Sequence, residues 1–206
     1  MDKDNSTEIK IKEAATRVFI AKGFYGCTSR EIAKEAGMNV ALVNYYFKSK
    51  SHLFEIVIAS VIEKFADSLF EVFKSDLPLV SKVRIFIEKE YDFLSNHREI
   101  PSFIINELSK QDADFFKSVG FSEAMKEAKI EEQVKEAQDK GEMRKINLVN
   151  IILLLMSNTN FPFMARPMIQ SIHNINNEDY TTHLILHKQY VIDMLINYLF
   201  PNSKEF

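Results

Sequence analysis

The stretch TSREIAKEAGMNVALVNYYFKSK, residues 28–50, decides the fold. It opens with a capping box, because the Thr28 hydroxyl can accept from the backbone N–H three residues on while the Glu31 carboxylate reaches back. A short helix over 29–36 is predicted to follow, and Gly37 ends it. The stretch therefore begins with a short, well-capped helix and a tight turn.

A second short helix is predicted over about 40–46, with Asn39 as its N-cap. Two short helices joined through a glycine have the geometry of a helix-turn-helix, whose second helix enters the major groove of DNA. Ala33 and Ala36 are small enough for the two helices to approach each other. The exposed face of the second helix offers Val40, Ala41, Asn44 and Tyr45. An asparagine can pair with adenine edges and apolar side chains can touch thymine methyl groups.

A further group of side chains is placed to hold the DNA backbone rather than to read bases. It consists of Thr28, Ser29, Arg30, Tyr46 and Lys50. Phosphate contacts set register more than sequence preference. The simpler interpretation is two short helices in an ordinary helical bundle, which periodicity does not exclude. The Asn-Tyr-Tyr run at 44–46 favours a DNA reader, because polar aromatic residues on a short exposed helix have no core to fill.

Charge is distributed unevenly along the chain. Residues 1–54 hold nine Lys/Arg and six Asp/Glu, a net +3, whereas residues 55–206 hold 17 and 23, a net −6. A basic head on an acidic body is typical of a DNA-binding unit attached to a body that does not bind DNA, although solvated helical faces give similar patterns.

The dense pattern of residues around this motif resembles a known family. The matching positions are Ala14-Ala15, Phe19, Lys22-Gly23-Phe24, Thr28, Ile32-Ala33, Ala36-Gly37, Tyr45, Phe47, Ser49-Lys50 and Leu53. Over residues 8–54 the chain resembles the N-terminal domain of TetR-family regulators. Many members have Gly at the position of Ala41 and Tyr at the position of Asn44, so these departures bear on which sequence is read.

The resemblance implies a transcriptional repressor that contacts double-stranded DNA at a palindromic operator. It carries DNA contact onto the nine residues named above, from Thr28 to Lys50. It also implies a variable C-terminal domain that binds a small-molecule effector, and a homodimer. A regulator that activates transcription fits the sequence as well.

The whole chain is expected to be all-α. Five Gly and five Pro in 206 residues give few turns for a many-stranded sheet. We predict an N-terminal three-helix helix-turn-helix DNA-binding domain over residues 1–50. A larger helical ligand-binding and dimerisation domain is predicted over 51–206. Its expected helices cover 51–74, 78–95, 101–110, 122–140, 147–158, 165–173 and 182–200, with a loop at 173–180.

The last two long helices, about 147–158 and 182–200, are the predicted dimer interface. The first is apolar nearly all round, so more than one side should be covered. A helix-turn-helix reader usually needs two half-sites, which favours a dimer over burial in a monomer core. His183 and His187 share a face of the last helix, and we expect them to be interface or surface residues rather than metal ligands.

Seventeen Phe and eight Met suggest an apolar pocket for a mostly apolar effector, although each such residue alone fits a core better. The candidate ligand residues are Phe93, Phe103, Asn106, Glu107, Met125, Asn158 and Phe161. Among them, the polar Asn106, Glu107 and Asn158 are the possible anchors.

Enzyme classes find little support. The sequence has no Gly-x-Ser-x-Gly, no glycine-rich phosphate loop and no Cys-x-x-Cys, so neither catalytic residues nor a cofactor or metal are expected. The longest apolar run, Ile151–Met156, is far shorter than a membrane span of roughly 20 residues. With one cysteine and a charged start, the chain is expected to be cytoplasmic. The main rival is a small helical ligand carrier or enzyme without DNA binding.

Overall fold

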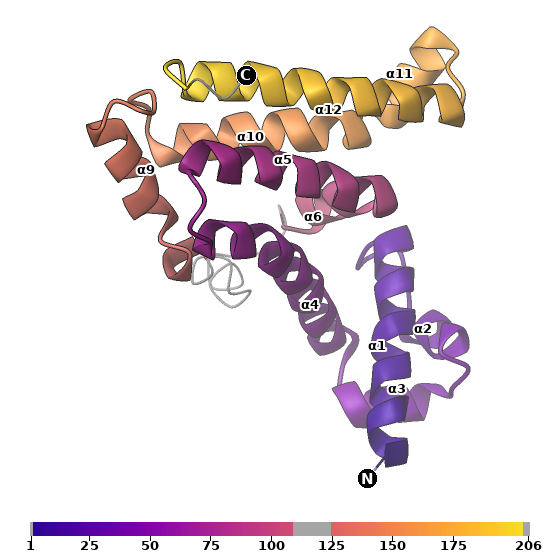
Figure 1. Cartoon of the computed structure of the whole chain (residues 1–206). Coiled ribbons are helices and arrows are strands. Elements are labelled where there is room, and N and C mark those ends of the chain that lie inside the picture. Colours follow the sequence, from indigo (N-terminus) through magenta and orange to yellow (C-terminus); the bar gives the residue numbers. More distant parts are fainter. Residues whose placement is uncertain (1, 109–124, 204–206) are drawn as a thin grey trace. The chain divides into compact units, whose positions relative to one another are not determined.

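The structure is a computed structural model, and it describes residues 2–108 and 125–203. All regular elements within these two ranges are helices, which confirms the all-α prediction for them (Figure 1). In chain order they are α1 (Asp2–Lys22), α2 (Ser29–Glu35), α3 (Val40–Phe47), α4 (Lys50–Phe70), the 3-10 helix η1 (Glu71–Lys74), α5 (Leu79–Asn96), α6 (Ile100–Leu108), α9 (Ile130–Asp139), α10 (Leu148–Met164), α11 (Arg166–His173) and α12 (Asn177–Leu199).

The described residues pack into two compact units, those within 1–64 and 102–121 and those within 65–101 and 122–206. The first unit extends past residue 50, because the first turns of α4 pack into its core with Leu53, Phe54, Val57 and Ile58. Aromatic rings fill this core: Phe54 lies edge-on to Phe19, with ring centroids 5.0 Å apart, and contacts Phe103 of α6 at 6.3 Å. Phe103 is therefore a core residue of the first unit.

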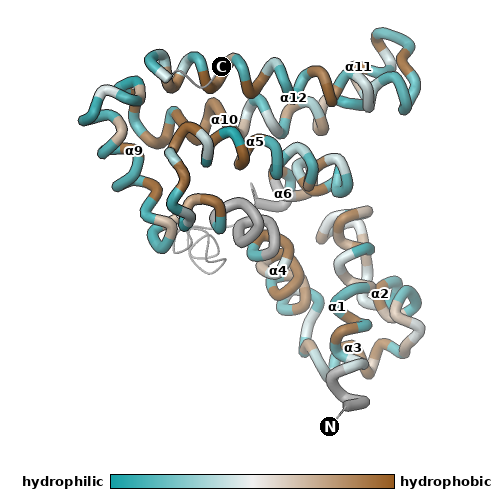
Figure 2. Tube along the Cα trace, in the orientation of Figure 1, coloured by the Kyte–Doolittle hydropathy of each residue, from teal (hydrophilic) through white to brown (hydrophobic). Residues whose placement is uncertain are grey.

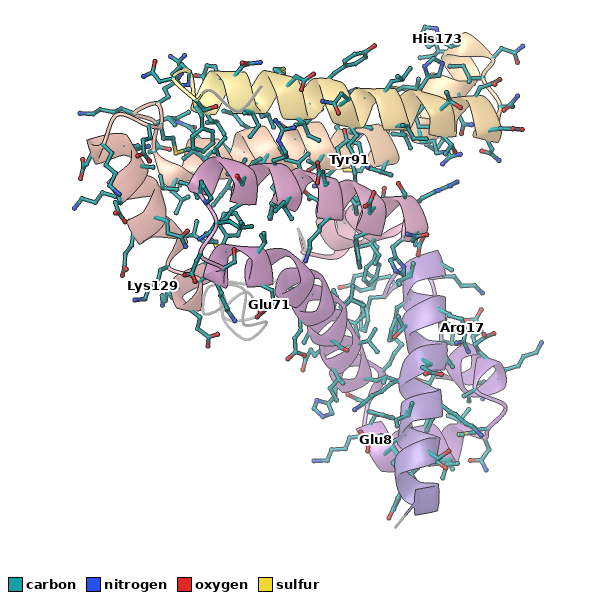
Figure 3. The ribbon with its side chains drawn as sticks, viewed as in Figure 1. Glu8, Arg17, Glu71, Tyr91, Lys129 and His173 are labelled. Atoms are coloured by element: carbon teal, nitrogen blue, oxygen red, sulfur yellow. The ribbon has the colours of Figure 1, made fainter. Side chains whose placement is uncertain are left out.

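The second unit is built around α5, which packs against α10 and α12, while α9 contacts its N-terminal side. In Figure 1, α10 and α12 lie side by side. Figure 2 shows α10 as mostly hydrophobic and α9 as mostly hydrophilic. The Tyr91 side chain, labelled in Figure 3, points from α5 toward α10 and α12 and is almost fully buried.

The predicted helix 147–158 is too short, because α10 continues through Pro162 to Met164. A proline cannot donate to the carbonyl four residues earlier, which leaves the Asn158 oxygen free. The Tyr91 hydroxyl donates to that oxygen at 3.2 Å. The Pro162 carbonyl in turn accepts from the Tyr180 hydroxyl at 2.7 Å. The Tyr91 hydroxyl thus replaces the one hydrogen bond that the proline removes, while Tyr180 bonds a carbonyl in the last turn of α10.

The single predicted helix 122–140 is also wrong where the structure describes it; residues 122–124 lie outside the described part. Lys129 adopts a left-handed conformation with φ 50°, and α9 begins only at Ile130. The Gln133 amide donates to the Ala128 oxygen at 2.7 Å and to the Phe73 oxygen at 2.9 Å. The break is therefore stabilised by a side chain that bonds the carbonyl it exposes.

Two other boundaries differ from the predictions. The α-helix predicted over 51–74 ends at Phe70, and a 3-10 turn completes it. The loop predicted over 173–180 is shorter, because the Asn176 side chain accepts from the backbone N–H groups of Glu178 and Asp179 and starts α12 at Asn177. An asparagine N-cap inside a polar run reads as loop in the sequence but begins a helix here.

Among the described residues, no single helix is both long and apolar enough to cross a membrane. Helices α10 and α11 together have the length and apolar composition of a membrane span, but the chain bends by 56° between them.

Candidate nucleic-acid interface

Two solvent-exposed ion pairs join α1 to α2 of the helix-turn-helix. Lys22 Nζ lies 2.6 Å from Glu31 Oε1, and Arg17 Nε lies 2.8 Å from Glu35 Oε1. Arg17 is labelled in Figure 3, where its side chain extends from α1 toward α2. Because these pairs are solvent-exposed they add little stability, so they mainly set the orientation of α2 on α1.

The capping box is present as predicted. The Thr28 hydroxyl accepts from the Glu31 backbone N–H at 3.3 Å, and Glu31 Oε2 accepts from the Thr28 backbone N–H at 2.8 Å. The hydrogen bond from Lys22, followed by those from Thr28, lowers the pKa of the Glu31 carboxyl to about 2. A carboxyl with a lowered pKa stabilises the fold above its ordinary value and loses that contribution as the pH falls. At neutral pH the ionised Glu31 carboxylate therefore keeps its hydrogen bonds with Lys22 and Thr28.

The turn between the two helices needs a left-handed residue. Gly37 takes this position with φ 68°, where an L side chain is strained. The Met38 N–H donates to the Ala33 oxygen at 2.8 Å, and the Asn39 side chain accepts from the Leu42 N–H at 2.8 Å. These bonds close α2 and open α3 within three residues, as the sequence predicts.

Helix α3 has one buried face and one free face. Val43 and Phe47 are buried in the core, while Ala41, Asn44 and Tyr45 are exposed. Tyr45 is 77% exposed although it is a large aromatic side chain. Of the other predicted contacts, Val40 and Tyr46 are half-buried and pack against the core. Three of the predicted base-reading side chains thus share one accessible surface.

The predicted phosphate contacts lie around that surface. Thr28 and Arg30 are exposed and Ser29 is half-buried, all at the beginning of α2. Lys48, which the sequence analysis overlooked, is exposed directly after α3 with a positive φ of 60°. The sequence does contain a signal for it, because Lys48 is a basic residue that closely follows the Asn-Tyr-Tyr run at 44–46.

Lys50 has a structural partner in this structure. Its Nζ donates to the Phe24 oxygen at 2.8 Å and to the Cys27 oxygen at 2.9 Å, and it lies 4.3 Å from the centre of the Phe24 ring. The ammonium group therefore ties the turn before α2 to the first turn of α4. Any contact with a phosphate would use its remaining N–H.

Replacing Lys50 with Met is expected to lower the free energy of unfolding by about 2 kcal/mol, since two charge-assisted hydrogen bonds are removed. The measurement is urea unfolding without DNA. Lys48→Met is the matched control, because Lys48 is exposed, and it should change stability by less than about 0.5 kcal/mol. Equal stability of the two variants would mean that Lys50 serves only DNA.

The candidate ligand residues are dispersed in the described part of the chain. Phe103 lies in the core of the first unit, Asn106 and Phe161 are exposed, and the Glu107 side chain is outside the described residues. Met125 and Asn158 are half-buried. Phe93 is half-buried and borders a hollow of about 310 Å³ on α5, where its ring lies 4.6 Å from that of His97.

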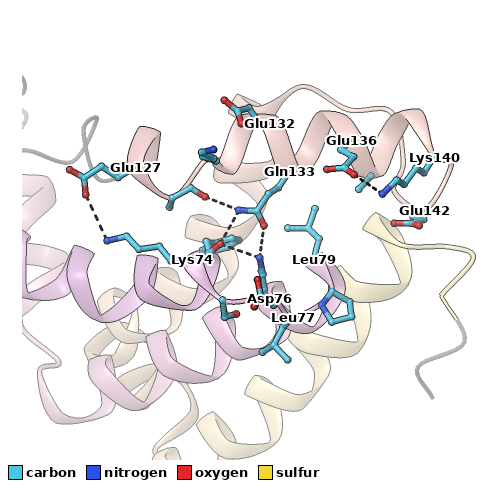
Figure 4. Close-up of a pocket in the computed structure, with 17 residues that line it drawn as sticks. Lys74, Asp76, Leu77, Leu79, Glu127, Glu132, Gln133, Glu136, Lys140 and Glu142 are labelled. Carbon is cyan, nitrogen blue, oxygen red and sulfur yellow. Dashed lines mark hydrogen bonds and ion pairs between the residues drawn. The ribbon is translucent and has the colours of Figure 1, made fainter.

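The largest hollow that we describe lies between α9 and the segment joining η1 to α5, with a volume of about 790 Å³ (Figure 4). Its walls are mainly charged, and three of its four lysines are already engaged. Lys74 pairs with Glu127, Lys140 with Glu136, and the buried Lys82 donates to the Gln133 amide oxygen at 2.7 Å. Such a surface suits solvent better than a mostly apolar molecule.

The described geometry defines a helix-turn-helix protein whose second helix presents a free polar and aromatic face. Comparison with known proteins agrees. Residues 11–57 match the model of the tetR family of bacterial regulatory proteins. The probable HTH-type transcriptional regulator YttP of Bacillus subtilis is 32% identical over 171 residues, covering 81% of this chain and 82% of the relative.

Solved structures share the fold. A TetR family regulator from Marinobacter aquaeolei aligns with a TM-score of 0.73 at 16% identity, covering 96% of this chain and 97% of that one. A TetR-family regulator from Haemophilus influenzae aligns with a TM-score of 0.71 at 19% identity, covering 97% and 100%. The chain belongs to the tetR family, and it is a DNA-binding transcription regulator.

Proposed function

We propose that this regulator is a repressor that binds a palindromic operator as a homodimer and is released by a small, mostly apolar effector. The exposed face of α3 is the observation that supports DNA binding. Asn44 and Tyr45 are exposed and have no structural task in the core, so their chemistry is available for base edges. Thr28, Ser29, Arg30 and Lys48 surround this face and would hold phosphates.

The dimer is supported by an uncovered apolar face on α10 and α12. Val149 and Leu153 are 65% and 59% exposed on α10, four residues apart and thus on one side of the helix. Leu186, Tyr190 and Met194 repeat this spacing on α12, at 49%, 64% and 49% exposed. Large apolar side chains gathered on two adjacent helices indicate an interface, and a two-fold arrangement would bury both copies. We call these five residues the dimer face.

Effector control requires only a difference in affinity between two states of the dimer. Helix α4 begins in the first compact unit and ends in the second. A change in the direction of its axis would therefore alter the spacing between the two copies of α3 in the dimer. An effector that prefers the wrong spacing by about 1–3 kcal/mol would weaken operator binding roughly 5- to 150-fold. A reporter gene under the operator separates repression from activation.

Variants of the reading surface test the proposal. Tyr45→Ala should weaken operator binding by about 1–3 kcal/mol for each half-site, with less effect on unrelated DNA, because base contacts carry specificity. Arg30→Gln should weaken binding to all sequences. It should also reduce the slope of log affinity against log salt by about one for each phosphate that is no longer neutralised, hence by about two per dimer.

Fluorescence anisotropy with operator and scrambled duplexes at several salt concentrations measures both effects. Glu8→Gln is a suitable control, since Glu8 lies on α1 and pairs only with Lys12 among the described residues. If Tyr45→Ala and Arg30→Gln left the affinity and the salt slope unchanged, α3 would not be the reader.

A further inference from the structure

Arg166 is a buried cation that is held entirely by neutral groups. It is 7% exposed at the first residue of α11. Its Nε donates to the Gln170 side-chain oxygen at 3.2 Å. Its Nη2 donates to the backbone oxygen and the side-chain oxygen of Asn177, at 3.2 and 3.0 Å. The guanidinium carbon lies 5.1 Å from the centre of the Tyr180 ring. These contacts fix the plane of the guanidinium.

The opposite end of the guanidinium has no partner within residues 2–108 and 125–203. Nη1 is buried and makes no hydrogen bond with any of them. Arg166 forms no ion pair with a described carboxylate, including Glu178 and Asp179 on the nearby first turn of α12. A buried charge without a counter-charge is costly, and so is a buried N–H without an acceptor. The fold therefore keeps two donors and a full positive charge ready at one place.

The surroundings add positive charge. Burial, followed by the positive charge of Arg98, lowers the pKa of the Arg166 guanidinium. Arg98 is exposed in the turn between α5 and α6, and its Nε donates to the Ser95 oxygen at 3.1 Å. Ala165 gives α11 no side-chain cap, so the positive end of the helix dipole also faces this region. An arginine is unfavourable at a helix N-terminus unless an anion accompanies it.

We propose that Arg166 binds the acid group of a small molecule, a carboxylate or phosphate. The two N–H groups of Nη1 can donate to two oxygens of such a group. Resting on the proposed function, this site assigns a chemical class to the effector: an apolar body that carries one anionic head. Gln170, Asn177 and Tyr180 are positioning residues that orient the guanidinium.

The experiment uses octanoate, 1-octanol and inorganic phosphate as probes of the full-length protein without DNA. Isothermal titration calorimetry should show that octanoate binds more tightly than octanol, which has the same tail without the charge. Arg166→Gln should weaken octanoate binding about tenfold to a hundredfold, because a charge-assisted hydrogen bond is removed. Phosphate binding without octanoate binding would assign the site to phosphate-bearing molecules instead of carboxylates. Arg144→Gln is the matched control, since Arg144 also lies over a tyrosine ring, that of Tyr198 at 4.4 Å, but is exposed.

A structural role for Arg166 gives a different pattern. If Arg166 only stabilised the fold, Arg166→Gln would lower the melting temperature and leave probe binding equal to that of Arg144→Gln. If its counter-charge came from a second copy, the variant would dissociate into monomers more readily and no probe would bind the wild type. Either pattern would overturn the proposal. Operator release is measured separately, so octanoate that binds at Arg166 without releasing DNA would contradict effector control while leaving the anion site intact.

Discussion

Leu153→Glu is expected to convert the proposed dimer into monomers and to abolish specific operator binding. Leu153 is 59% exposed in the single chain, so the fold should tolerate the charge. In a two-fold interface the carboxylate would be buried without a partner in both copies, which costs several kcal/mol in total. We expect the dissociation constant of the dimer to rise by at least about a thousandfold, or about 4 kcal/mol.

Sedimentation velocity measures the assembly, and anisotropy with the operator measures the consequence. Leu77→Glu is the matched control, because Leu77 is 45% exposed but lies outside α10 and α12. A Leu153→Glu variant that stayed dimeric at the concentrations used for the wild type would remove the dimer face from its proposed role. A monomer that still bound the operator with full affinity would contradict the need for two half-sites.

Glu90→Gln is expected to make the protein more stable at pH 8 and to have little effect at pH 4.5. Glu90 is 0% exposed on α5; Asn160 Nδ2 donates to its Oε1 at 2.8 Å, while its Oε2 has no partner. Burial raises the pKa of this carboxyl to about 7, against weaker opposing effects from hydrogen bonds with Thr159 and Asn160. The ionised form is therefore disfavoured in the folded chain.

The raised pKa of Glu90 makes the folded chain less stable as the pH rises. Below about pH 4.5 the carboxyl is protonated in both the folded and the unfolded chain, and the fold bears no penalty from it. As the pH rises toward about 7, the unfolded chain loses this proton first, and stability falls by roughly 3 kcal/mol in total. Glu90→Gln removes this loss.

Urea unfolding of both proteins at a series of pH values measures the difference. Glu88→Gln is the matched control, two residues away on the same helix and only half-buried. Parallel stability curves for the wild type and Glu90→Gln would show that Glu90 does not titrate in this range.

Local rules predicted the head well and the body less well. The capping box at Thr28, the turn at Gly37 and the cap at Asn39 each depend on residues within three positions, so the sequence contains the whole interaction. Lys50 is different, because its partners are the Phe24 and Cys27 carbonyls across a turn. A lysine near a predicted DNA surface suggests phosphate binding, and only the folded chain reveals the backbone contacts.

In the second unit, tertiary contacts override local signals. Pro162 predicts a helix end, yet Tyr91, far away in sequence, satisfies the carbonyl that the proline leaves free. Lys129 carries no turn signal, yet the helix breaks there because Gln133 bonds the exposed carbonyl. Arg166 reads as an ordinary helix residue between two prolines, and its lack of a counter-charge appears only when its surroundings are known.

In the proposed function, two copies of α3 read a specific DNA sequence. The most direct measurement is selection of bound fragments from the source genome with the full-length protein, followed by titration of the most enriched fragment. We expect a palindrome whose half-sites are separated by about one helical turn of DNA, and Tyr45→Ala should lose that enrichment. Enrichment of no sequence, with weak binding that Tyr45→Ala does not alter, would contradict the account.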